Sequence, residues 1–195
     1  MKIFYVTSND NKIAEFKDFL NELEIKENYN LELQIKQLKK DEKLQEILHR
    51  DIKVIVEAKA LEAYKLMGVP CVVEHGGIFI DSLSELPGGI GQIIWDAVGD
   101  RICSFIKEGE SRSATACSII GYCDGRQIRT FTGKTKGEIT ESARGDYKFN
   151  WDPIFKPEGS ELTYGEMGME KKRETSQAKK AWKNFLSSFD ALSKK

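Results

Sequence analysis

The order of apolar and polar residues at the start of the chain predicts a strand followed by a helix. Residues 2–6 form a short apolar run rich in β-forming side chains, which is typical of a buried strand. A polar stretch at residues 7–12 follows. Beyond it, apolar residues recur at helical spacing, at Ile13, Phe16, Leu20 and Leu23. The pattern therefore predicts a helix that begins near Asn11 or Lys12.

A second strand and a long helix are predicted next. Residues 31–35 alternate between apolar and polar types, as a half-buried strand does, whereas residues 36–50 are dense in charge and fit a loop or a short helix. One apolar face recurs through residues 51–67, and Gly68 supplies a helix stop signal. The apolar positions of this face are Ile52, Ile55, Val56, Ala60, Ala63 and Leu66.

The middle of the chain is predicted to contain short strands, a turn and one more helix. Residues 70–73 are typical of a short buried strand, which would present residues 74–77 at its C-terminal end. Residues 78–81 continue extended. Residues 86–89 (LPGG) predict a turn, and residues 90–106 are predicted to be mostly helical.

After residue 110 the apolar period changes from helical to alternating. Residues 113–122 and 127–134 predict the two strands of a hairpin, because the Asp-Gly pair between them is a strong turn signal. Residues 137–140 fit a further short strand. The last helix is predicted over residues 175–192, with an apolar face made of Ala181, Trp182, Phe185, Leu186 and Phe189.

This order of elements predicts an α/β protein with an antiparallel hairpin in its second half. A chain of 195 residues can bury a proper core as one domain. We expect a single domain over residues 1–195. Within it we expect a core lobe of about residues 1–110 plus 140–195 and a hairpin insertion of about residues 111–140.

Charge and composition argue against nucleic acid or a membrane as the partner. Lys and Arg number 30 and Asp and Glu number 31, so the formal net charge is only -1. No apolar run approaches the length of a membrane span, and no signal peptide is recognisable at the start. The 4 cysteines show no Cys-x-x-Cys spacing, so buried free thiols are expected rather than a zinc site. Together these features predict a cytoplasmic protein.

Residues 7–12 combine the features of an anion-binding site. A strand that runs through a polar loop into a helix N-terminus directs free backbone N–H groups and the positive end of the helix dipole at one point. Lys12 adds a full charge to that point. The alternative is an ordinary strand–turn–helix capped by Ser8 or Asn9. The loop lacks the glycines and the Gly-Lys-Ser/Thr ending of a Walker P-loop.

Four separated motifs resemble those of one enzyme family. Residues 7–12 (TSNDNK) are similar to T-[GS]-N-x-x-K and residues 86–88 to L-P-G. Residues 149–155 (FNWDPIF) resemble F-G-[WY]-D-P-x-F, and residues 163–176 resemble T-[FY]-A-E-[ML] followed by E-K-[NS]-x-x-S. In this order and spacing, the motifs resemble those of the inosine triphosphate pyrophosphatases. These enzymes cleave ITP, dITP and XTP to a monophosphate and pyrophosphate.

The resemblance implies a fold, an assembly and a ligand. The fold would be an elongated α/β structure with a mixed central sheet flanked by helices, two lobes around a nucleotide cleft and, usually, a homodimer. The ligand would be a purine nucleoside triphosphate, held by charge-assisted hydrogen bonds. The residues that the resemblance assigns to its phosphates are Thr7, Ser8, Asn9, Asn11, Lys12, Lys59 and Lys172.

The same resemblance places the purine base against the FNWDP motif. Phe149 and Trp151 would wall the base, and Asp152 would accept hydrogen bonds from it. Asn150 stands where the family has a glycine, so its side chain crowds the loop beside Phe149.

The family's S-H-R motif, which contacts the 6-oxo group of the base, is Ser176-Gln177-Ala178 in this chain. Gln177 can both donate and accept, so part of that recognition is retained. Losing a buried hydrogen-bond donor to a ligand costs on the order of 1–3 kcal/mol. We expect Ser176 and Gln177 to contact the base.

The largest departure from the family lies where a metal ion and a base would act. The family uses a glutamate before the long helix and the aspartate of an [ED]-D-[ST]-G motif to hold Mg²⁺ and activate water. Here the glutamate is Glu46, with Glu42 as a competing position, and the motif is EHGG at residues 74–77. We expect Glu46 and Glu74 as ligands of Mg²⁺, with Mn²⁺ as the alternative that better tolerates a histidine nitrogen, and His75 as the candidate general base.

These departures affect catalysis and base recognition, whereas the phosphate loop, the aromatic wall and Lys172 are retained. The leading hypothesis is a catalytically weakened or inactive sensor that binds dITP-, ITP- or XTP-like nucleotides and signals to a partner protein. The alternatives are an active pyrophosphatase with a rearranged metal site, and a structural subunit that has lost the ligand. The expected partners are the nucleotide and either a second copy of the chain in a homodimer or an effector in a hetero-complex.

Overall fold

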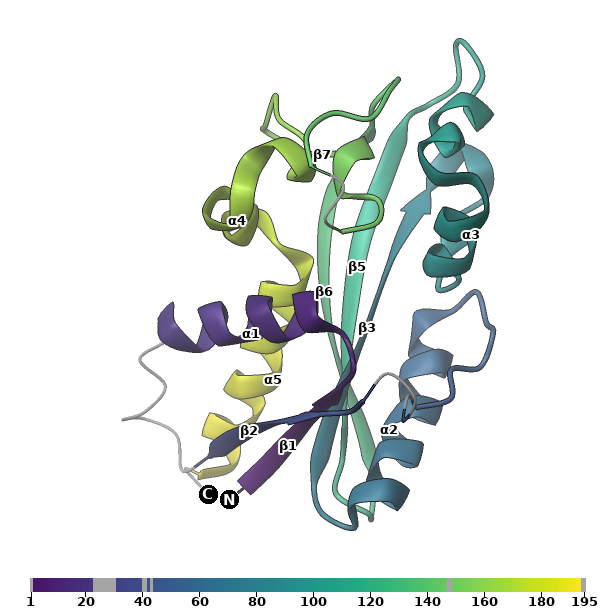
Figure 1. Cartoon of the computed structure of the whole chain (residues 1–195). Coiled ribbons are helices and arrows are strands. Elements are labelled where there is room, and N and C mark those ends of the chain that lie inside the picture. The colour runs from purple at the N-terminus through teal and green to yellow at the C-terminus, as the bar shows by residue number, and fades with distance from the viewer. Residues whose placement is uncertain (1, 23–30, 40–41, 43, 147–148, 194–195) are drawn as a thin grey trace.

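A long, twisted, mixed β-sheet forms the centre of an elongated molecule (Figure 1). The computed structural model describes residues 2–22, 31–39, 42, 44–146 and 149–193. The strands are β1 (Lys2–Thr7), β2 (Glu32–Gln37), β3 (Cys71–Ile80), β4 (Leu86–Gly88), β5 (Ser113–Cys123), β6 (Ile128–Ile139) and β7 (Phe155–Pro157). Their order in the sheet is β2-β1-β3-β5-β6-β7, and β4 pairs with β3. The expected α/β class and mixed sheet are confirmed.

Helices cover both faces of this sheet. They are α1 (Asp10–Glu22), α2 (Ile52–Met67), α3 (Gly91–Val98), α4 (Tyr164–Thr175) and α5 (Gln177–Ser193), with 3₁₀ turns η1 (Asp81–Leu83), η2 (Gly99–Phe105) and η3 (Asp152–Ile154). In Figure 1, α1 and α5 lie on one side of the long strands, and α2 and α3 lie on the other.

The pairing of β3 leaves its middle open along one edge. β1 runs parallel to β3 and pairs with it only through Phe4–Tyr5. β4 pairs antiparallel with residues 78–80 at the far end of β3, while β5 pairs with β3 along all 10 of its residues. Residues 73–77 of β3 therefore face a gap between β1 and β4, and the functional site is built at this gap.

An aromatic cluster joins α1 and α5 to the sheet. The ring centroid of Tyr5 lies 4.9 Å from that of Phe16 and 5.0 Å from that of Trp182, and all three side chains are buried. Burying a ring of this size stabilises the fold by roughly 1.5–3 kcal/mol. The predicted face of the last helix is confirmed for Ala181, Trp182, Phe185 and Leu186, whereas the side chain of Phe189 lies outside the described residues.

Helix α2 begins and ends where its capping residues predict. The side chain of Asp51 accepts from the N–H of Lys53, and Gly68 closes the helix with a φ of 66° in the left-handed region. The residues of α2 that are buried are Ile52, Ile55, Val56, Ala60 and Ala63. The prediction that Leu66 belongs to this face was wrong, because in the last turn it is Met67 that packs against the core and Leu66 is 57% exposed.

Two strand predictions and one turn prediction were wrong in their bounds. β3 continues through residues 74–77, because β5 pairs with it along its whole length, so these residues lie in the middle of a strand and not at its end. Residues 86–88 form the short strand β4, and the chain turns before them, at residues 81–85. Residues 137–139 complete β6 and do not form a separate strand.

Helix α4 was missed by the apolar pattern. Its only buried residues are Tyr164 and Lys172, so it carries no apolar periodicity. It begins with a capping box in which the Thr163 side chain accepts from the N–H of Glu166 and the Glu166 side chain accepts from the N–H of Thr163. That Thr-x-x-Glu pattern was the sequence signal that predicts its start.

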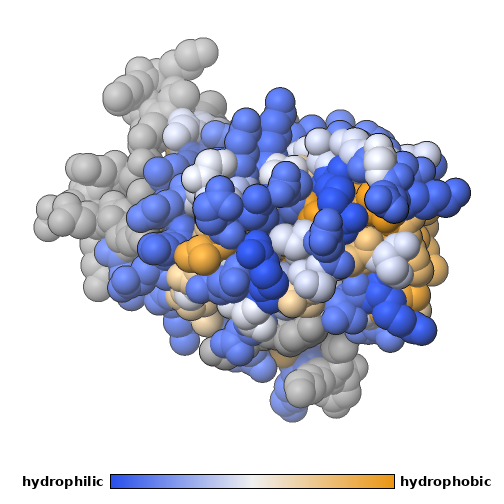
Figure 2. Space-filling view, turned by 90° about the horizontal axis from the view of Figure 1, so that it is seen from above, coloured by the Kyte–Doolittle hydropathy of each residue, from blue (hydrophilic) through white to orange (hydrophobic). Residues whose placement is uncertain are grey.

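The described surface is mostly hydrophilic when the molecule is seen from the end that carries α3 and α4 (Figure 2). Its hydrophobic area gathers on the side where α3 lies. Exposed apolar side chains of α3 and of the elements that contact it, η2 and β4, are Ile93, Phe105 and Leu86. Among the described residues, no helix is long and apolar enough to cross a membrane. All four cysteines are buried free thiols, as expected.

Candidate functional site

A cavity of about 670 Å³ opens at the gap beside the middle of β3. Its walls come from the loop before α1, the segment that leads into α2, β3 itself, α3, the loop after β6, and helices α4 and α5. Most of the predicted site residues meet there: Thr7, Ser8, Asn9, Lys12, Glu46, Lys59, Glu74, His75, Phe149, Asn150, Trp151, Lys172 and Gln177. The cavity lining does not include Asn11, Asp152 or Ser176.

The loop between β1 and α1 forms one end of the cavity. The Oγ1 of Thr7 accepts from the N–H of Asn9 at 3.1 Å, and the Oδ1 of Asn9 accepts from the N–H groups of Asn11 and Lys12 at 3.0 and 3.2 Å. Asn9 therefore caps α1 and satisfies two of the N–H groups that an anion would otherwise meet. The ammonium of Lys12 and the positive end of the α1 dipole still favour a phosphate here.

The position of Lys12 follows from the open edge of β3. Its Nζ donates to the backbone oxygen of Glu74 at 3.0 Å. Backbone acceptors in the middle of a strand normally pair with a neighbouring strand. Because β1 and β4 both stop short of this part of β3, the lysine takes that place and is held at the cavity wall.

A charged centre made of Lys59, Glu46 and His75 lies beside this loop. The Nζ of Lys59 donates to the Oε1 of Glu46, and the Nδ1 of His75 lies 3.7 Å from the Oε2 of the same carboxylate. Burial alone would raise the pKa of Glu46, but the Lys59 ammonium lowers it below its ordinary value. Burial and the nearby Lys12 lower the pKa of Lys59. The carboxylate therefore stays ionised and is already neutralised by a lysine.

His75 is held as a neutral imidazole. Its Nε2 lies 2.8 Å from the backbone oxygen of Gly89, which can only accept, so Nε2 carries the proton. Burial, together with the charge of Lys12, lowers the pKa of His75 to about 4. At neutral pH, Nδ1 is therefore unprotonated and is a weak base.

The side chain of Glu74 is held by hydrogen bonds from the two strands next to β3. Its Oε2 accepts from the hydroxyl of Tyr5 at 3.0 Å and its Oε1 accepts from the hydroxyl of Ser118 at 2.8 Å. Both carboxylate oxygens thus have buried donors, and the residue is only 6% exposed. Its role as a metal ligand stays a prediction.

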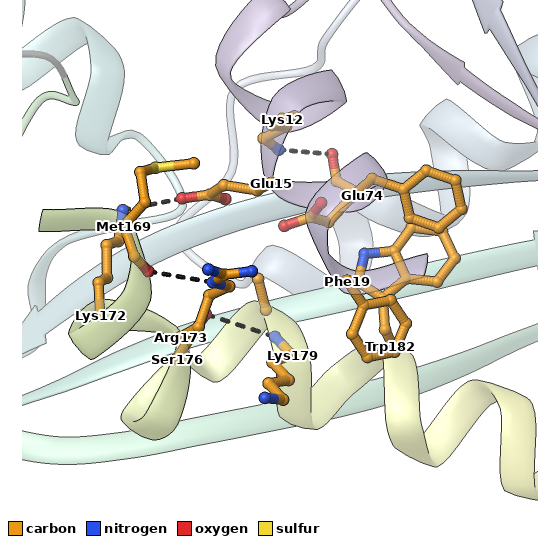
Figure 3. A pocket seen from close by; sticks show the side chains of 12 residues that line it. Lys12, Glu15, Phe19, Glu74, Met169, Lys172, Arg173, Ser176, Lys179 and Trp182 are labelled. Carbon is orange, nitrogen blue, oxygen red and sulfur yellow. Dashed lines mark hydrogen bonds and ion pairs between the residues drawn. The ribbon is translucent and has the colours of Figure 1, made fainter. Parts of the chain in front are cut away.

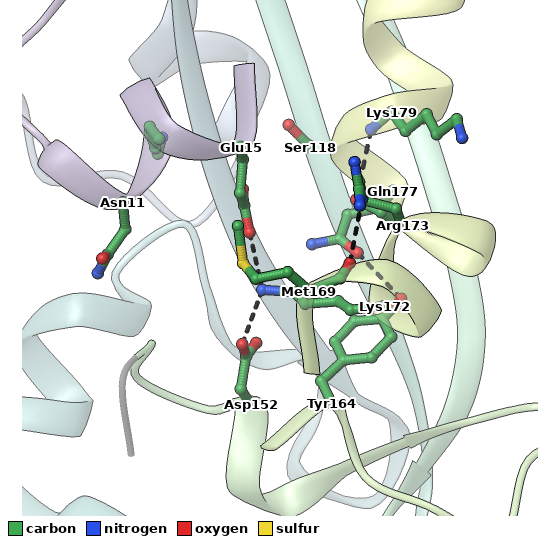
Figure 4. A network of polar contacts seen from close by, with 12 residues as sticks. Asn11, Glu15, Ser118, Asp152, Tyr164, Met169, Lys172, Arg173, Gln177 and Lys179 are labelled. Carbon is green, nitrogen blue, oxygen red and sulfur yellow. Dashed lines mark hydrogen bonds and ion pairs between the residues drawn. The ribbon is translucent and has the colours of Figure 1, made fainter. Parts of the chain in front are cut away.

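Lys172 lies between two carboxylates in the part of the cavity that Phe149 also lines (Figure 4). Its Nζ donates to Asp152 Oδ2 at 2.7 Å and to Glu15 Oε1 at 2.9 Å, and it lies 4.5 Å from the ring centroid of Phe149. Burial opposes the charge, but the two carboxylates raise the pKa of Lys172 above its ordinary value. Lys172 is therefore a fixed cation in the cavity wall, in contact with the ring of Phe149.

Aromatic side chains line the same end. Trp151 is buried and packs edge-on against Phe155, at a centroid distance of 5.9 Å. Phe149 meets Trp151 edge-on at 6.2 Å. The packed Trp151 fixes the wall, and both rings line the cavity, as expected for a surface against which a purine can lie.

Two polar atoms in this part of the site have no hydrogen-bond partner among the described residues. The Oδ1 of Asp152 is buried with no hydrogen bond, and burial raises the pKa of Asp152 to about 6. The Oε1 of Gln177 lies 3.3 Å from the hydroxyl of Tyr164. No described residue accepts a hydrogen bond from the Gln177 amide nitrogen, and Gln177 lines the cavity. Gln177 therefore offers the cavity an unpaired donor, whereas the unpaired Oδ1 of Asp152 is buried outside the cavity lining.

A small enclosed pocket adjoins this end between α1, α4 and α5 (Figure 3). Ser176 lines this pocket and not the main cavity, and its Oγ accepts from the N–H of Lys179 at 3.4 Å. The pocket has room for about 20 Å³, which suits a single water molecule. Contact between Ser176 and the base stays a prediction.

Several cavity residues were not predicted from the sequence. They are Glu15, Leu38, Leu44, Gly76, Gln92, Asp96 and Ala178. For Glu15 a signal existed, because it follows Lys12 by three residues and so shares its helix face. For Gln92 and Asp96 the sequence contains no such signal, since α3 is brought to the cavity only by the packing of the sheet.

A family model supports the resemblance noted in the motifs. The model of the Ham1 family matches residues 3–188. The chain belongs to the Ham1 family. Its resemblance to the inosine triphosphate pyrophosphatases is thereby confirmed, and the dITP/XTP pyrophosphatases among its relatives agree with it.

Two relatives show how closely this Ham1-family chain follows proteins with a stated activity. It is 35% identical over 188 residues to the dITP/XTP pyrophosphatase of Methanopyrus kandleri, covering 95% of this chain and 94% of that protein. It is 36% identical over 194 residues to the dITP/XTP pyrophosphatase of Pyrococcus horikoshii, covering 95% of both chains. The similarity therefore spans the whole fold.

Solved structures show the same fold. A HAM1 protein from Coxiella burnetii matches with a TM-score of 0.77 at 19% identity, over 100% of both chains. A nucleoside-triphosphatase (dITP/XTP pyrophosphatase) from Mycobacterium abscessus matches with a TM-score of 0.69 at 24% identity, over 95% of this chain and 99% of that one.

Members of the Ham1 family generally use a divalent metal ion, Mg²⁺. The residues present in this chain do not fit an ion held by the protein alone. The carboxylate of Glu46 is paired with Lys59, both oxygens of Glu74 have hydroxyl donors, and the remaining donor is an imidazole nitrogen, which Mg²⁺ disfavours. Within the described ranges, no group of three or more His, Cys, Asp or Glu side chains is placed to hold a metal.

Proposed function

We propose that this Ham1-family protein binds a 6-oxopurine nucleoside triphosphate, such as dITP, ITP or XTP, and hydrolyses it slowly, so that the bound state persists. The observation that carries the proposal is the pairing of Glu46 with Lys59 beside a neutral His75. It lies next to an intact phosphate loop and an intact aromatic wall.

The binding part of the proposal rests on charge and shape. Lys12 and Lys59 stand at one end of a cavity of about 670 Å³, with the N-terminus of α1 beside them. This end attracts the phosphates. The rings of Phe149 and Trp151 line the same cavity and suit the base. A cationic part and an aromatic wall within one cavity match the two parts of a nucleotide.

The 6-oxopurine part rests on hydrogen-bond polarity. Hypoxanthine and xanthine present a donor at N1 and an acceptor at O6, whereas adenine presents an acceptor at N1 and a donor at its 6-amino group. Asp152 Oδ1 is an unpaired acceptor, and Gln177 has an amide nitrogen free to donate. This pair complements the N1–H and O6 of a 6-oxopurine. Adenine presents its donor and acceptor in the opposite order, so it is matched only if the two protein groups meet it in exchanged positions, and a mismatched group typically costs on the order of 1–3 kcal/mol.

Slow hydrolysis follows from the charged centre. A general base works best when the pKa of its conjugate acid is near the working pH. His75, with a pKa of about 4, is too weak a base to remove a proton from water efficiently at pH 7. Glu46 is ionised, but the Lys59 ammonium already balances its charge. We infer that Mg²⁺ enters as the counter-ion of the nucleotide and not as a resident of the protein.

The experiment compares turnover with binding in the same samples. dITP is incubated with the protein and Mg²⁺ or Mn²⁺, pyrophosphate release is followed, and dITP binding is measured by calorimetry with dATP as the competitor. We expect dITP binding that dATP does not displace, with slow release of pyrophosphate. Rapid turnover would overturn the slow-hydrolysis part, and no binding of any purine triphosphate would leave only a structural subunit.

A matched variant tests the diagnosis of the centre. His75→Asp places a second carboxylate beside Glu46, which converts the donor set to one that Mg²⁺ prefers. We expect the variant to release pyrophosphate at least tenfold faster than the wild type, with dITP binding retained. A folded variant that binds dITP without any gain in turnover would count against this role of His75.

An active pyrophosphatase is the second candidate. The observation that favours it is the name shared by relatives 35% and 36% identical over 95% of the chain, which are dITP/XTP pyrophosphatases. The turnover measurement above separates it from the first candidate.

In the first candidate the occupied protein acts on a partner, which is either a second copy of the chain or a different effector protein. The mass of the complex with and without dITP distinguishes those two partners.

A further inference from the structure

A hydrogen-bonded bridge joins the loop at residues 149–151 (the base-binding loop of the proposed function) to α3 in the cavity wall. The Nδ2 of Asn150 donates to the Oε1 of Gln92 at 2.5 Å, although the two residues are 58 positions apart. The Nε2 of Gln92 donates in turn to the Oδ1 of Asp96 at 2.7 Å, one helical turn further along α3. All three side chains line the main cavity. Both polar atoms of the Gln92 amide are thus engaged, the oxygen by the loop and the nitrogen by the helix.

The segment that leads into α3 is tied to the other half of the cavity. The backbone oxygen of Gly89 lies 2.8 Å from the Nε2 of His75 in β3, and its N–H donates to the backbone oxygen of Arg50 at 3.0 Å. Residues 89–98 therefore meet the charged centre at one end and the base-binding loop at Gln92. Helix α1 also has polar links to both parts of the cavity, through Lys12 and through Glu15.

The packing of α3 makes these polar links important. Gly91 is the only fully buried residue of the helix, and Ile94, Trp95 and Val98 are only partly buried against the core. Ile93 is 48% exposed. A helix with so few buried apolar contacts moves at a lower cost than a helix such as α5, so its position depends more on the bridge.

We propose that Gln92 is a positioning residue that couples occupancy of the base site to the order of α3. The inference rests on the proposed function, because it needs a purine nucleotide at Phe149 and Trp151. A base bound against these rings fixes the loop that carries Asn150. The loop then fixes Gln92, and through Gln92 and Asp96 it fixes α3, whose outer side is the hydrophobic side of the surface (Figure 2). Helix α3 is thus the element through which a bound nucleotide changes the outside of the molecule.

The test combines nucleotide affinity with hydrogen–deuterium exchange of the full chain. In the wild type we expect dITP to slow exchange both at residues 149–155 and at residues 91–98. Gln92→Ala and Asn150→Gly each remove the bridge. We expect them to weaken dITP binding about 3- to 10-fold, as befits one neutral hydrogen bond at a partly exposed site. At saturating dITP we expect both variants to keep the protection from exchange at residues 149–155 and to lose it at residues 91–98.

Two further variants separate coupling from general damage. Asn184→Ala removes an amide hydrogen bond of the same kind, from Asn184 Nδ2 to the backbone oxygen of Thr132 at 2.8 Å, on the far helix α5. It should leave both the affinity and the protection unchanged. The double variant Gln92→Glu/Asp96→Asn keeps an oxygen for Asn150 and reverses the second hydrogen bond, so protection at residues 91–98 should return.

Different failures point to different errors. If Gln92→Ala binds dITP and still shows full protection at residues 91–98, the coupling through Gln92 is overturned while the proposed function stands. If wild-type dITP binding protects residues 149–155 but never α3, the same conclusion follows. If the wild type binds no purine triphosphate at all, the proposed function and this inference fall together.

Discussion

At the scale of single residues, a histidine in place of a carboxylate changes both the charge and the proton chemistry of the site. His75 is largely shielded from solvent and lies near Lys12 and Lys59, so it stays neutral where an aspartate would be charged. The Nε2 of His75 donates its proton to the backbone oxygen of Gly89, so the weakly basic Nδ1 faces Glu46. The residue therefore links β3 to the loop before α3. At this position a structural hydrogen bond takes the place of the negative charge that an aspartate would supply.

This environment predicts a pH-dependent stability. The pKa of His75 is lowered to about 4 in the folded chain from an ordinary value of 6.5. Between pH 6.5 and 4 the unfolded state therefore takes up a proton that the folded state does not, so stability is lost as the pH falls through this window. We expect His75 to cost about 2–3 kcal/mol over that range.

The measurement is denaturant unfolding of wild type and His75→Gln at pH 7 and pH 4.5. Gln keeps a donor for Gly89 and does not titrate. The raised pKa of Asp152, about 6, acts in the opposite direction in the same window, because the folded state there binds the extra proton. Asp152 is present in both proteins, so its effect cancels in the difference. Equal losses of stability in the two proteins would contradict the assignment to His75.

At the scale of elements, the close approach of α5 to the sheet depends on a glycine in β6. A Cβ at Gly133 would collide with the backbone oxygen of Gln177 and would lie 2.5 Å from the backbone nitrogen of Ala181. Both atoms belong to the start of α5. Because backbone atoms of a packed helix cannot step aside individually, the helix would have to move as a whole.

We therefore expect Gly133→Ala to lower the free energy of unfolding by about 2–3 kcal/mol. The same shift would displace Gln177, so dITP binding should weaken as well. Gly91→Ala is the control for stability, because a Cβ there would meet only the Cγ of Pro87, at an ordinary 3.9 Å. Denaturant unfolding of the two variants measures the difference, and equal stabilities would show that α5 does not depend on this glycine.

At the scale of the whole molecule, the ligand should link the two ends of the cavity. dITP added with Mg²⁺ contacts α1, β3, the base-binding loop and α5 if it binds as proposed. A ligand at about 100 times its dissociation constant adds about 2.7 kcal/mol to the free energy of unfolding. For a chain of this size, that is about 5–10 °C in melting temperature.

Mg²⁺ alone should give no such shift. Within the described part of the chain no cluster of carboxylates is placed to hold it. Differential scanning calorimetry with Mg²⁺, with dITP, and with both measures the two effects separately. A large stabilisation by Mg²⁺ alone would contradict the conclusion that the protein does not hold this ion by itself.

Much of the fold and part of the site could be predicted from the sequence, for a local reason. The helix at residues 52–67 was readable because an N-cap, an apolar period and a C-terminal glycine all lie within the segment. Lys12, Phe149 and Lys172 were assigned from short motifs, and all three line the cavity. Helix α4 was missed because only two of its residues are buried, even though its capping box was visible.

The remaining features depend on pairs of residues that are far apart in the chain. Lys172 and Glu15 are 157 positions apart, and Asn150 and Gln92 are 58 positions apart. No local pattern constrains such pairs. The hairpin of β5 and β6, expected as an insertion, pairs with β3 along that strand's full length, and this too is decided by sheet order and not by the hairpin's own sequence.

The sequence by itself determined most of the elements, the family and the chemical character of the site residues, because caps, apolar periods and motifs each act over a few neighbouring residues. Only the tertiary structure decided how these parts interact. It opened the edge of β3 where the cavity lies, gave the Asn9 side chain the N–H groups of α1, and paired Glu46 with Lys59. Burial and charge pairing depend on every group that packs around a site, so the balance between binding and hydrolysis is set by the packed fold.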